Sequence, residues 1–355
     1  MFLYSINIIL IFLIYFILLY INSKTKINVK KIYCIIITIQ MILFSGLRHY
    51  SVGADTFSYY LNFEMVKGMS WEKIIRIFFD SLYSNRYYFK DPGYLIFQKI
   101  FQIFSGDYQL YLIFIAIIFT VPLGILIYKK SQNPLLSFLI YFCLFFAFFG
   151  ITGIRQTVAT SLVGIYGYWA IINKKLNYFI ILSIIAFFIH KSSILFSPFY
   201  FIAFQKFQLK HIIMILLVFL LSFIFFNVKI FSPIANFFKY ENMLYFNIKG
   251  TETYSSLILL IFITILWRKN TFLKKIDNYF YFNAIFLGLF LTLMTFKSQS
   301  FMRIQQYFNF YYILAIPEII ETFNKKDKYM VLLIAISVLL FLYFRLDKYY
   351  KFFWQ

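Results

Sequence analysis

Residues 2–22 of the chain read FLYSINIILIFLIYFILLYIN and contain no charged side chain. A helix needs about 20 apolar residues to cross the hydrocarbon core of a bilayer, so this stretch predicts a first transmembrane helix. It has neither a basic start nor a small-residue cleavage site, which favours a retained span over a removed signal peptide. These first residues already predict a membrane protein.

Comparable apolar runs continue through all 355 residues, of which 62% are hydrophobic and 13% charged. Soluble domains carry roughly 25% charged residues, so the composition excludes a soluble globular enzyme. We predict an all-α polytopic membrane protein with about 12 transmembrane helices, residues 1–355 forming one integral membrane domain without an evident internal repeat. The predicted spans lie near residues 2–22, 33–47, 108–128, 134–150, 155–172, 177–190, 192–204, 211–227, 255–267, 279–296, 304–320 and 329–345.

The net charge of +21 is divided among short clusters between the apolar runs. This pattern is typical of loops at an anionic membrane surface, so nucleic acid is not an expected partner. The positive-inside rule places six short Lys-rich loops in the cytoplasm. Six of the seven arginines lie elsewhere, which favours planar partners such as phosphate or carboxylate for them. The six loops contain Lys24, Lys26, Lys30, Lys31; Lys129, Lys130; Lys174, Lys175; Lys206, Lys210; Arg268, Lys269, Lys274, Lys275; and Lys325, Lys326, Lys328.

The same rule places residues 48–107, the loop 228–254 and both termini on the outer side. Residues 48–107 are too polar to span a bilayer and too aromatic for a slack linker. Amphipathic helices are expected at 56–66 and 71–79, and a third after Asp91-Pro92-Gly93. We interpret this outer segment as a lid resting on the bilayer.

Cys34 and Cys143 both fall inside apolar runs. This placement argues against a disulfide framework and against a zinc site built from Cys and His ligands. No metal and no cofactor is expected.

Polar residues collect where predicted spans meet the outer side. In the first cluster, Gly53 permits a tight turn between Arg48 and Asp55. Asp55 either caps the following helix or acts chemically from the helix face that it shares with Tyr59. In the second cluster, Arg155 and Gln156 begin a span, where a guanidinium and helix N-terminal amides favour an anion. The alternative is that Arg155 extends toward a lipid phosphate.

Two further clusters lie on the same predicted side. His190 precedes Lys191-Ser192-Ser193 in a turn, where it is a candidate base or phosphate partner or a surface histidine without chemistry. Arg303 and Tyr307 are four residues apart and share a helix face, which can also be a polar helix end. A cluster of this kind, taken alone, more often has a structural role than a chemical one. Charged groups at membrane depth, however, tend to mark functional sites. Together they predict a site for an anionic lipid head group at the outer interface.

These residues resemble the EpsG-type branch of the Wzy polysaccharide polymerases from about residue 44 to 320. The pattern consists of Gly46-Leu47-Arg48, Val52-Gly53-Ala54-Asp55-Thr56 with Tyr59, Asp91-Pro92-Gly93-Tyr94, Arg155-Gln156 with Ala159, His190-Lys191-Ser192-Ser193, and Arg303 with Tyr307. The first cluster is its most specific part. The loop 228–254 departs from the pattern, and a role in substrate preference is the hypothesis for it.

The resemblance implies a GT-C-like architecture and a multi-pass enzyme of the bacterial plasma (inner) membrane. Its activity would be glycosyl transfer from undecaprenyl pyrophosphate to a lipid-linked repeat unit in O-antigen, capsule or exopolysaccharide synthesis. Membrane lipids, a flippase and a chain-length regulator are the implied partners. The roles are pyrophosphate binding for Arg48, Arg155 and Arg303; base for Asp55 first and His190 second; and substrate orientation for Tyr59, Gln156 and Tyr307.

Other functions remain open at this point. An O-antigen ligase or another lipid-linked glycosyltransferase would use the same pyrophosphate chemistry with a different acceptor. A flippase or transporter should instead carry ionisable groups along a pathway at mid-membrane depth. A third alternative is a structural partner in a polysaccharide assembly complex, without catalysis.

Overall fold

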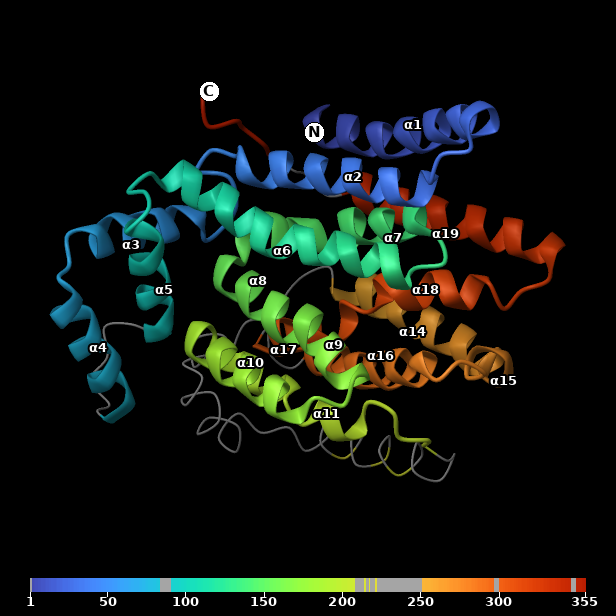
Figure 1. Cartoon of the computed structure of the whole chain (residues 1–355). Coiled ribbons are helices and arrows are strands. Elements are labelled where there is room, and N and C mark those ends of the chain that lie inside the picture. Colours follow the sequence, from blue (N-terminus) through green and yellow to red (C-terminus); the bar gives the residue numbers. More distant parts are fainter. Residues whose placement is uncertain are drawn as a thin grey trace.

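The computed structural model describes residues 2–83, 91–207, 214, 217, 221, 251–296, 300–345 and 349–355. Every regular element in these ranges is helical (Figure 1), so the predicted all-α class is confirmed. The α-helices are α1 (Phe2–Thr25), α2 (Val29–Gly46), α3 (Thr56–Lys67), α4 (Trp71–Tyr83), α5 (Pro92–Gln102), α6 (Tyr108–Lys130), α7 (Pro134–Ile140), α8 (Ile154–Thr160), α9 (Gly167–Ile172), α10 (Leu176–Ile189), α11 (Phe199–Ile202), α14 (Thr251–Trp267), α15 (Lys269–Phe272), α16 (Asp277–Met294), α17 (Ser300–Asn309), α18 (Tyr312–Ile320) and α19 (Lys325–Arg345). The π-helical segments η1 (Tyr141–Phe145), η2 (Ala147–Thr152) and η3 (Ser161–Tyr166) and the 3₁₀-helix η4 (Lys191–Phe196) complete the order.

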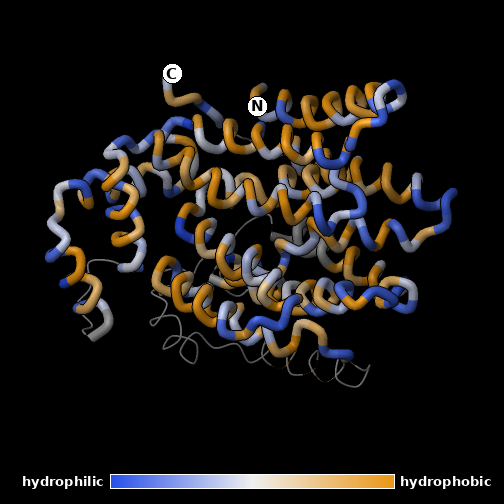
Figure 2. Tube along the Cα trace, viewed as in Figure 1, coloured by the Kyte–Doolittle hydropathy of each residue, from blue (hydrophilic) through white to orange (hydrophobic). Residues whose placement is uncertain are grey.

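Four helices of the described residues are long and apolar enough to cross a membrane, namely α1, α2, α6 and α19. They coincide with predicted spans because each is an uninterrupted apolar run without an internal break in helix geometry. Figure 2 shows the apolar stretches of the helices between hydrophilic loops and ends. The chain has the features of a multi-pass membrane protein.

Several other predicted spans in the described residues are shorter or interrupted, whereas 279–296 corresponds to the continuous 18-residue helix α16. The expected span 192–204 is wrong: the chain forms η4 and the four-residue α11, which together are too short to cross. Pro198 lies at the break: it has no backbone N–H to donate to the carbonyl four residues before it, so it interrupts the helical hydrogen bonds. The expected span 304–320 divides into α17 and α18. The predicted number of about twelve spans is therefore not confirmed by the described residues.

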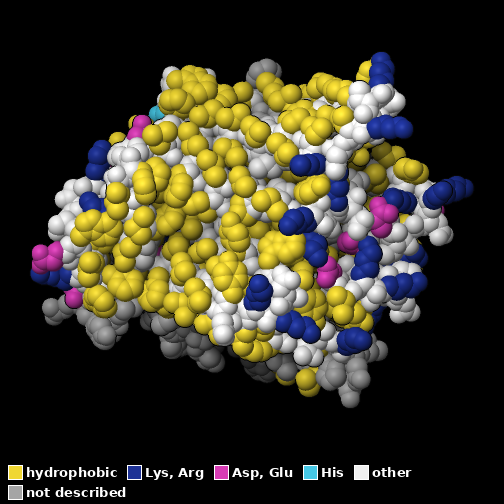
Figure 3. Space-filling view, viewed as in Figure 1, with side chains coloured by type: hydrophobic (Ala, Val, Ile, Leu, Met, Phe, Trp, Pro, Cys, Tyr) yellow, Lys and Arg dark blue, Asp and Glu magenta, His cyan; other side chains and the backbone are white. Residues whose placement is uncertain are grey.

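Lys and Arg side chains gather at the end of the molecule opposite α3 and α4 (Figure 3). This end carries the loops between α1 and α2, between α6 and α7, and between α18 and α19 (Figure 1). These Lys-rich loops thus lie at the end of the molecule opposite α3 and α4, in agreement with the separation that the charge pattern predicts.

Helices form at all three positions expected in residues 48–107, as α3, α4 and α5. Of these, α4 and α5 are amphipathic, whereas α3 has apolar side chains on its exposed as well as its buried side. Buried Phe63 of α3 packs against Phe101 and Tyr111, and Tyr59 packs edge-on against Tyr94. These contacts join α3 and α5 to α6 in one apolar cluster. The segment is therefore bound to the protein through α3 and α5, rather than resting on lipid alone.

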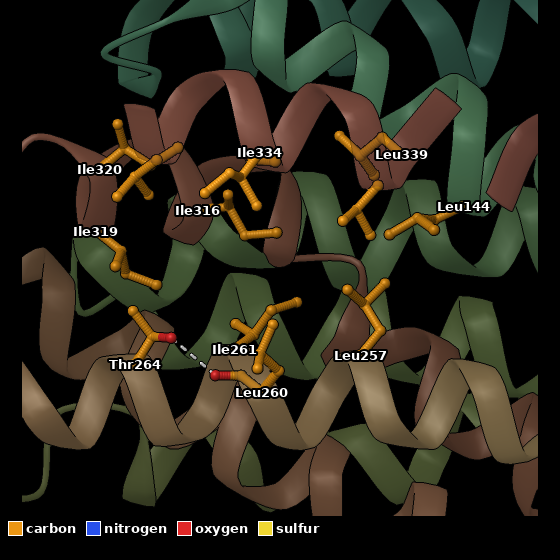
Figure 4. Close-up of a pocket in the computed structure, with 13 residues that line it drawn as sticks. Leu144, Leu257, Leu260, Ile261, Thr264, Ile316, Ile319, Ile320, Ile334 and Leu339 are labelled. Carbon is orange, nitrogen blue, oxygen red and sulfur yellow. Dashed lines mark hydrogen bonds between the residues drawn. The ribbon is translucent and has the colours of Figure 1, made fainter. Parts of the chain in front are cut away.

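An apolar cavity of about 130 Å³ lies among α14, α18 and α19 (Figure 4). Its one polar lining side chain, Thr264, donates a hydrogen bond to the Leu260 carbonyl of its own helix. The cavity therefore has no group to recognise a charged head group. The predicted span 211–227, apart from residues 214, 217 and 221, lies outside the described residues. Of the predicted loop 228–254, residues 228–250 also lie outside them, and residues 251–254 belong to the helix α14 rather than to a loop.

Candidate functional site

The polar site begins at the turn that starts α5. Asp91 occupies the N-cap position but makes no capping hydrogen bond, and Pro92 follows it at the first helical position. Proline suits this position because its missing N–H would have had no partner in the helix. Instead of capping α5, the Asp91 side chain extends to α8 and to the end of α10.

Gly93 brings the start of α5 against the end of α10. A Cβ atom at this position would lie 2.6 Å from the Phe188 Cβ and 2.7 Å from its carbonyl oxygen. No L side chain fits there without moving one of the two backbones. The Pro-Gly pair that follows Asp91 thus sets the distance between the Asp91 carboxylate and the His190 turn.

We expect Gly93→Ala to destabilise the protein by about 1–3 kcal/mol, the usual cost of overpacking. The matched control is Gly68→Ala, where the nearest atom to the added Cβ lies 3.8 Å away. Thermal unfolding in detergent measures both variants. Equal midpoints for the two variants would contradict the close approach of α5 and α10.

The Asp91 carboxylate is completely buried and receives three donors. Its Oδ2 lies 2.8 Å from Nη1 of Arg155 and 3.3 Å from Nδ1 of His190. Its Oδ1 accepts a 3.1 Å hydrogen bond from the Lys191 backbone N–H. Burial alone would raise the pKa of Asp91, but the Arg155 guanidinium, His190 and the Lys191 N–H together hold this pKa well below its usual range.

Arg155 stands between Asp91 and Tyr59. Its Nε lies 3.4 Å from the Tyr59 hydroxyl, and the guanidinium carbon lies 5.5 Å from the centre of the Tyr59 ring, within cation–π range. The side chain is 23% exposed, so the guanidinium is held on one side and open on the other. The pair with a protein carboxylate was not anticipated from sequence, where a substrate anion was the expected partner.

His190 is buried and faces the Asp91 carboxylate through Nδ1. Burial lowers the pKa of His190; Asp91 opposes this effect, and the positive charges of Arg155 and Arg303 reinforce it. The balance of these effects favours the neutral form of the imidazole. Because the Asp91 carboxylate is ionised, a hydrogen bond between the two requires the proton on Nδ1.

Arg303 and its neighbours form the second half of the site. Its Nη2 lies 3.9 Å from the Asp55 carboxylate, and the side chains are 22% and 50% exposed. Gln156 donates a hydrogen bond to the Arg303 carbonyl, while its own side-chain oxygen has no hydrogen-bond partner among the described residues. The buried Tyr307 hydroxyl lies 3.4 Å from Ser192 Oγ, in the turn that follows His190.

Asp55 sits at the N-cap position of α3 without making a side-chain capping bond, so the interpretation of Asp55 as a simple cap is wrong. Gly53 has a φ of +109°, which confirms the tight turn predicted before Asp55. This backbone conformation is strained for any residue with a Cβ. The turn places the carboxylate of Asp55 beside Arg303.

Arg48 lies apart from these groups. It is 1% exposed, donates through Nη1 to the Ser45 carbonyl, and pairs by backbone with Phe352. The C-terminal residues cover it, with Tyr350 stacked at 4.3 Å on Phe44. No carboxylate of the described residues pairs with Arg48, and its Nε has no hydrogen-bond partner there. Burial lowers the pKa of Arg48.

Seven of the eight sequence-predicted site residues are thus brought together, and Arg48 is the exception. The seven are Tyr59, Asp55, Arg155, Gln156, His190, Arg303 and Tyr307. The residue that sequence reasoning missed as a site member is Asp91, at the centre of the first half. The sequence feature that could have indicated it is an aspartate directly before Pro-Gly, on the same predicted side as the arginines. An aspartate in that local pattern is usually a helix cap, so the sequence alone did not assign it to the site. Within the described residues, no three His, Cys, Asp or Glu side chains are grouped to hold a metal ion.

Fold and site together define a multi-pass helical membrane protein with a buried Asp–His–Arg group and a second Arg–Asp pair beside it. The model of the EpsG family matches residues 31–354 of the chain. The protein belongs to the EpsG family, which is associated with exopolysaccharide synthesis. Comparisons with curated proteins and with solved structures find no match.

Proposed function

We propose that the protein is a polysaccharide polymerase of the plasma membrane. It would transfer a growing glycan from undecaprenyl pyrophosphate to a lipid-linked repeat unit at the outer face. The observation that carries the proposal is the meeting of Arg155 and Arg303, each about one-fifth exposed, with the buried His190 in a chain of the EpsG family.

At the anomeric carbon of the growing glycan, the reaction makes one C–O bond and breaks another. A hydroxyl oxygen of the incoming unit attacks the anomeric carbon at the reducing end of the growing glycan. The bond from that carbon to the pyrophosphate oxygen breaks, and undecaprenyl pyrophosphate leaves with the electron pair. The hydroxyl proton passes to a base on the protein.

Arg155 and Arg303 fit the leaving group because guanidinium groups bind phosphate oxygens in bidentate fashion. Each is balanced by a protein carboxylate, so the empty site holds no unpaired arginine charge. Negative charge that develops on the leaving oxygen would be stabilised by donors already in position. Contact of Arg48 with substrate would require the C-terminal residues to move, and its proposed role is tested separately by Arg48→Lys.

Two groups are candidates for the base. Asp55 is half exposed and lies beside Arg303, whereas His190 is buried and neutral. A neutral imidazole accepts a proton at a pH near neutrality, which favours His190. Tyr59, Gln156 and Tyr307 would orient sugar or phosphate oxygens around this centre.

Deletion of the gene in its native host tests the function. The expected result is loss of the long-chain surface polysaccharide with single repeat units retained, and recovery of the long chains on complementation. Loss of every attached unit would instead indicate a ligase or a flippase. An unchanged profile would contradict the proposal and favour a structural role.

A further inference from the structure

Asp91 holds two parts of the candidate site at once. One oxygen of its carboxylate contacts both the Arg155 guanidinium and the His190 ring, and the other accepts the Lys191 N–H. These donors come from α8 and from the turn after α10, while Asp91 itself begins α5. A single buried carboxylate thereby ties together three segments that are distant in sequence.

We infer that Asp91 is a positioning residue that fixes the tautomer of His190 and the orientation of Arg155. This inference rests on the proposed polymerase function for its catalytic meaning, but the arrangement that it describes can be measured without activity. Asp91 acts through the two side chains and not on the substrate, since both of its carboxylate oxygens are occupied by donors of the protein.

The consequence for His190 follows from the hydrogen bond. With the proton on Nδ1 directed at Asp91, Nε2 of the neutral ring carries the lone pair and is the basic nitrogen. When the ring takes up a proton during the reaction, the adjacent carboxylate stabilises the imidazolium that forms. A carboxylate that orients a histidine is a recurring arrangement of general-base sites.

The consequence for Arg155 follows from geometry. Asp91 at 2.8 Å and the Tyr59 hydroxyl at 3.4 Å hold the guanidinium from two directions. A flexible arginine loses side-chain entropy when it binds an anion, and a guanidinium already held in place loses less. Asp91 also neutralises Arg155 before substrate arrives, so the buried charge is paired in the empty protein.

Asp91→Asn is the discriminating variant because it keeps the size and removes one acceptor. A carboxylate offers two acceptor oxygens to three donors, whereas an amide offers one oxygen and one NH₂ group. The Lys191 N–H is fixed in the backbone and must keep an acceptor, so the amide oxygen faces it and the NH₂ group faces His190 and Arg155. The partly exposed Arg155 side chain can turn away from this donor, whereas the buried His190 must present an unprotonated Nδ1 to it. The variant is therefore expected to switch the tautomer.

The chain is suited to a direct reading of this switch, since it contains only three histidines, at positions 49, 190 and 211. The protein is labelled with ¹⁵N-histidine, reconstituted in phospholipid nanodiscs at pH 8, and compared with His190→Gln to assign the signal. The ¹⁵N shifts distinguish protonated from unprotonated ring nitrogens. The matched control is Asp107→Asn, because Asp107 caps α6 and asparagine is an equally good cap.

We expect protonated Nδ1 at His190 in the wild type and in Asp107→Asn, and protonated Nε2 in Asp91→Asn. In the same samples, polymer formation by Asp91→Asn should fall by roughly 10²-fold, the lower range of general-base effects. Protonated Nε2 in the wild type, or an unchanged tautomer in Asp91→Asn, would overturn the inference. If Asp91→Asn does not fold, the wild-type tautomer alone decides. A tautomer switch in Asp91→Asn, combined with no polymer formation by the wild-type protein, would refute the proposed function and leave the positioning role intact.

Discussion

Arg155→Lys should abolish most polymer formation while the protein remains at its wild-type level. Lysine keeps the positive charge beside the buried Asp91, so the pair that stabilises the fold is retained. It lacks the planar fork that binds two phosphate oxygens. Loss of one such donor from a site of developing charge costs about 10²–10³-fold in rate.

Arg155→Ala should show the same loss with an additional effect on stability. Removing one partner of a buried ion pair destabilises by about 3–5 kcal/mol, because it leaves the other charge uncompensated. The matched control is Arg76→Lys: Arg76 also lies in the outer segment and pairs with a carboxylate, that of Glu72, but is 71% exposed. The surface polysaccharide ladder, normalised to protein level, measures all three variants. Near-normal ladders from Arg155→Lys would contradict the bidentate role.

His190→Gln should lower polymer formation by about 10²–10⁴-fold, the range of general-base catalysis. The control is His49→Gln, since His49 bonds to Ser51 within its own turn and lies outside the candidate site. Equal activity of His190→Gln and wild type would transfer the base role to Asp55.

The pH dependence of stability on the acid side provides an independent prediction for His190. Burial, Arg155 and Arg303 lower the pKa of His190 against the opposing effect of Asp91. The folded value therefore lies below the unfolded value of about 6.5, and the unfolded chain takes up the proton first. The contribution of neutral His190 to stability is present above pH ~6.5 and declines as the pH falls toward the folded value.

Polymer formation in proteoliposomes should accordingly be level from about pH 7 to 8 and decline only below about pH 6.5. Asp91 adds no change in this window, because its pKa is held well below its usual range. The residual activity of His190→Gln should lack the acid decline. A decline centred above the ordinary pKa of histidine in the wild type would show that a different group titrates.

The sequence predicted those helices that depend only on the length and spacing of their apolar residues. The predicted span 108–128 matches α6, and the amphipathic stretch 71–79 matches α4. A helix also forms at 56–66, as α3, but its apolar side chains lie on both sides rather than on one face. Periodicity and apolar length suffice for such elements. The same reasoning failed at 192–204, where hydrophobic content concealed a proline break between two short helices.

The site was predictable as a set of residues but not as a set of contacts. Charge sidedness grouped Arg155, His190 and Arg303 at one predicted face, and the structure brings them together. Asp91 lies 64 residues before Arg155, and no local period reports a contact over that separation. The burial of Arg48 depends on packing of the C-terminal residues against Phe44 and Leu47, which is equally invisible to local pattern.

Reconstituted polymerisation tests the central claim most directly. The purified protein in proteoliposomes is supplied with undecaprenyl-pyrophosphate-linked repeat units as the only substrate. The account predicts a ladder of lengthening lipid-linked glycans with one undecaprenyl pyrophosphate released per bond formed, and no ladder from Arg155→Lys. Movement of repeat units across the bilayer without a ladder, or an equal ladder from Arg155→Lys, would contradict it.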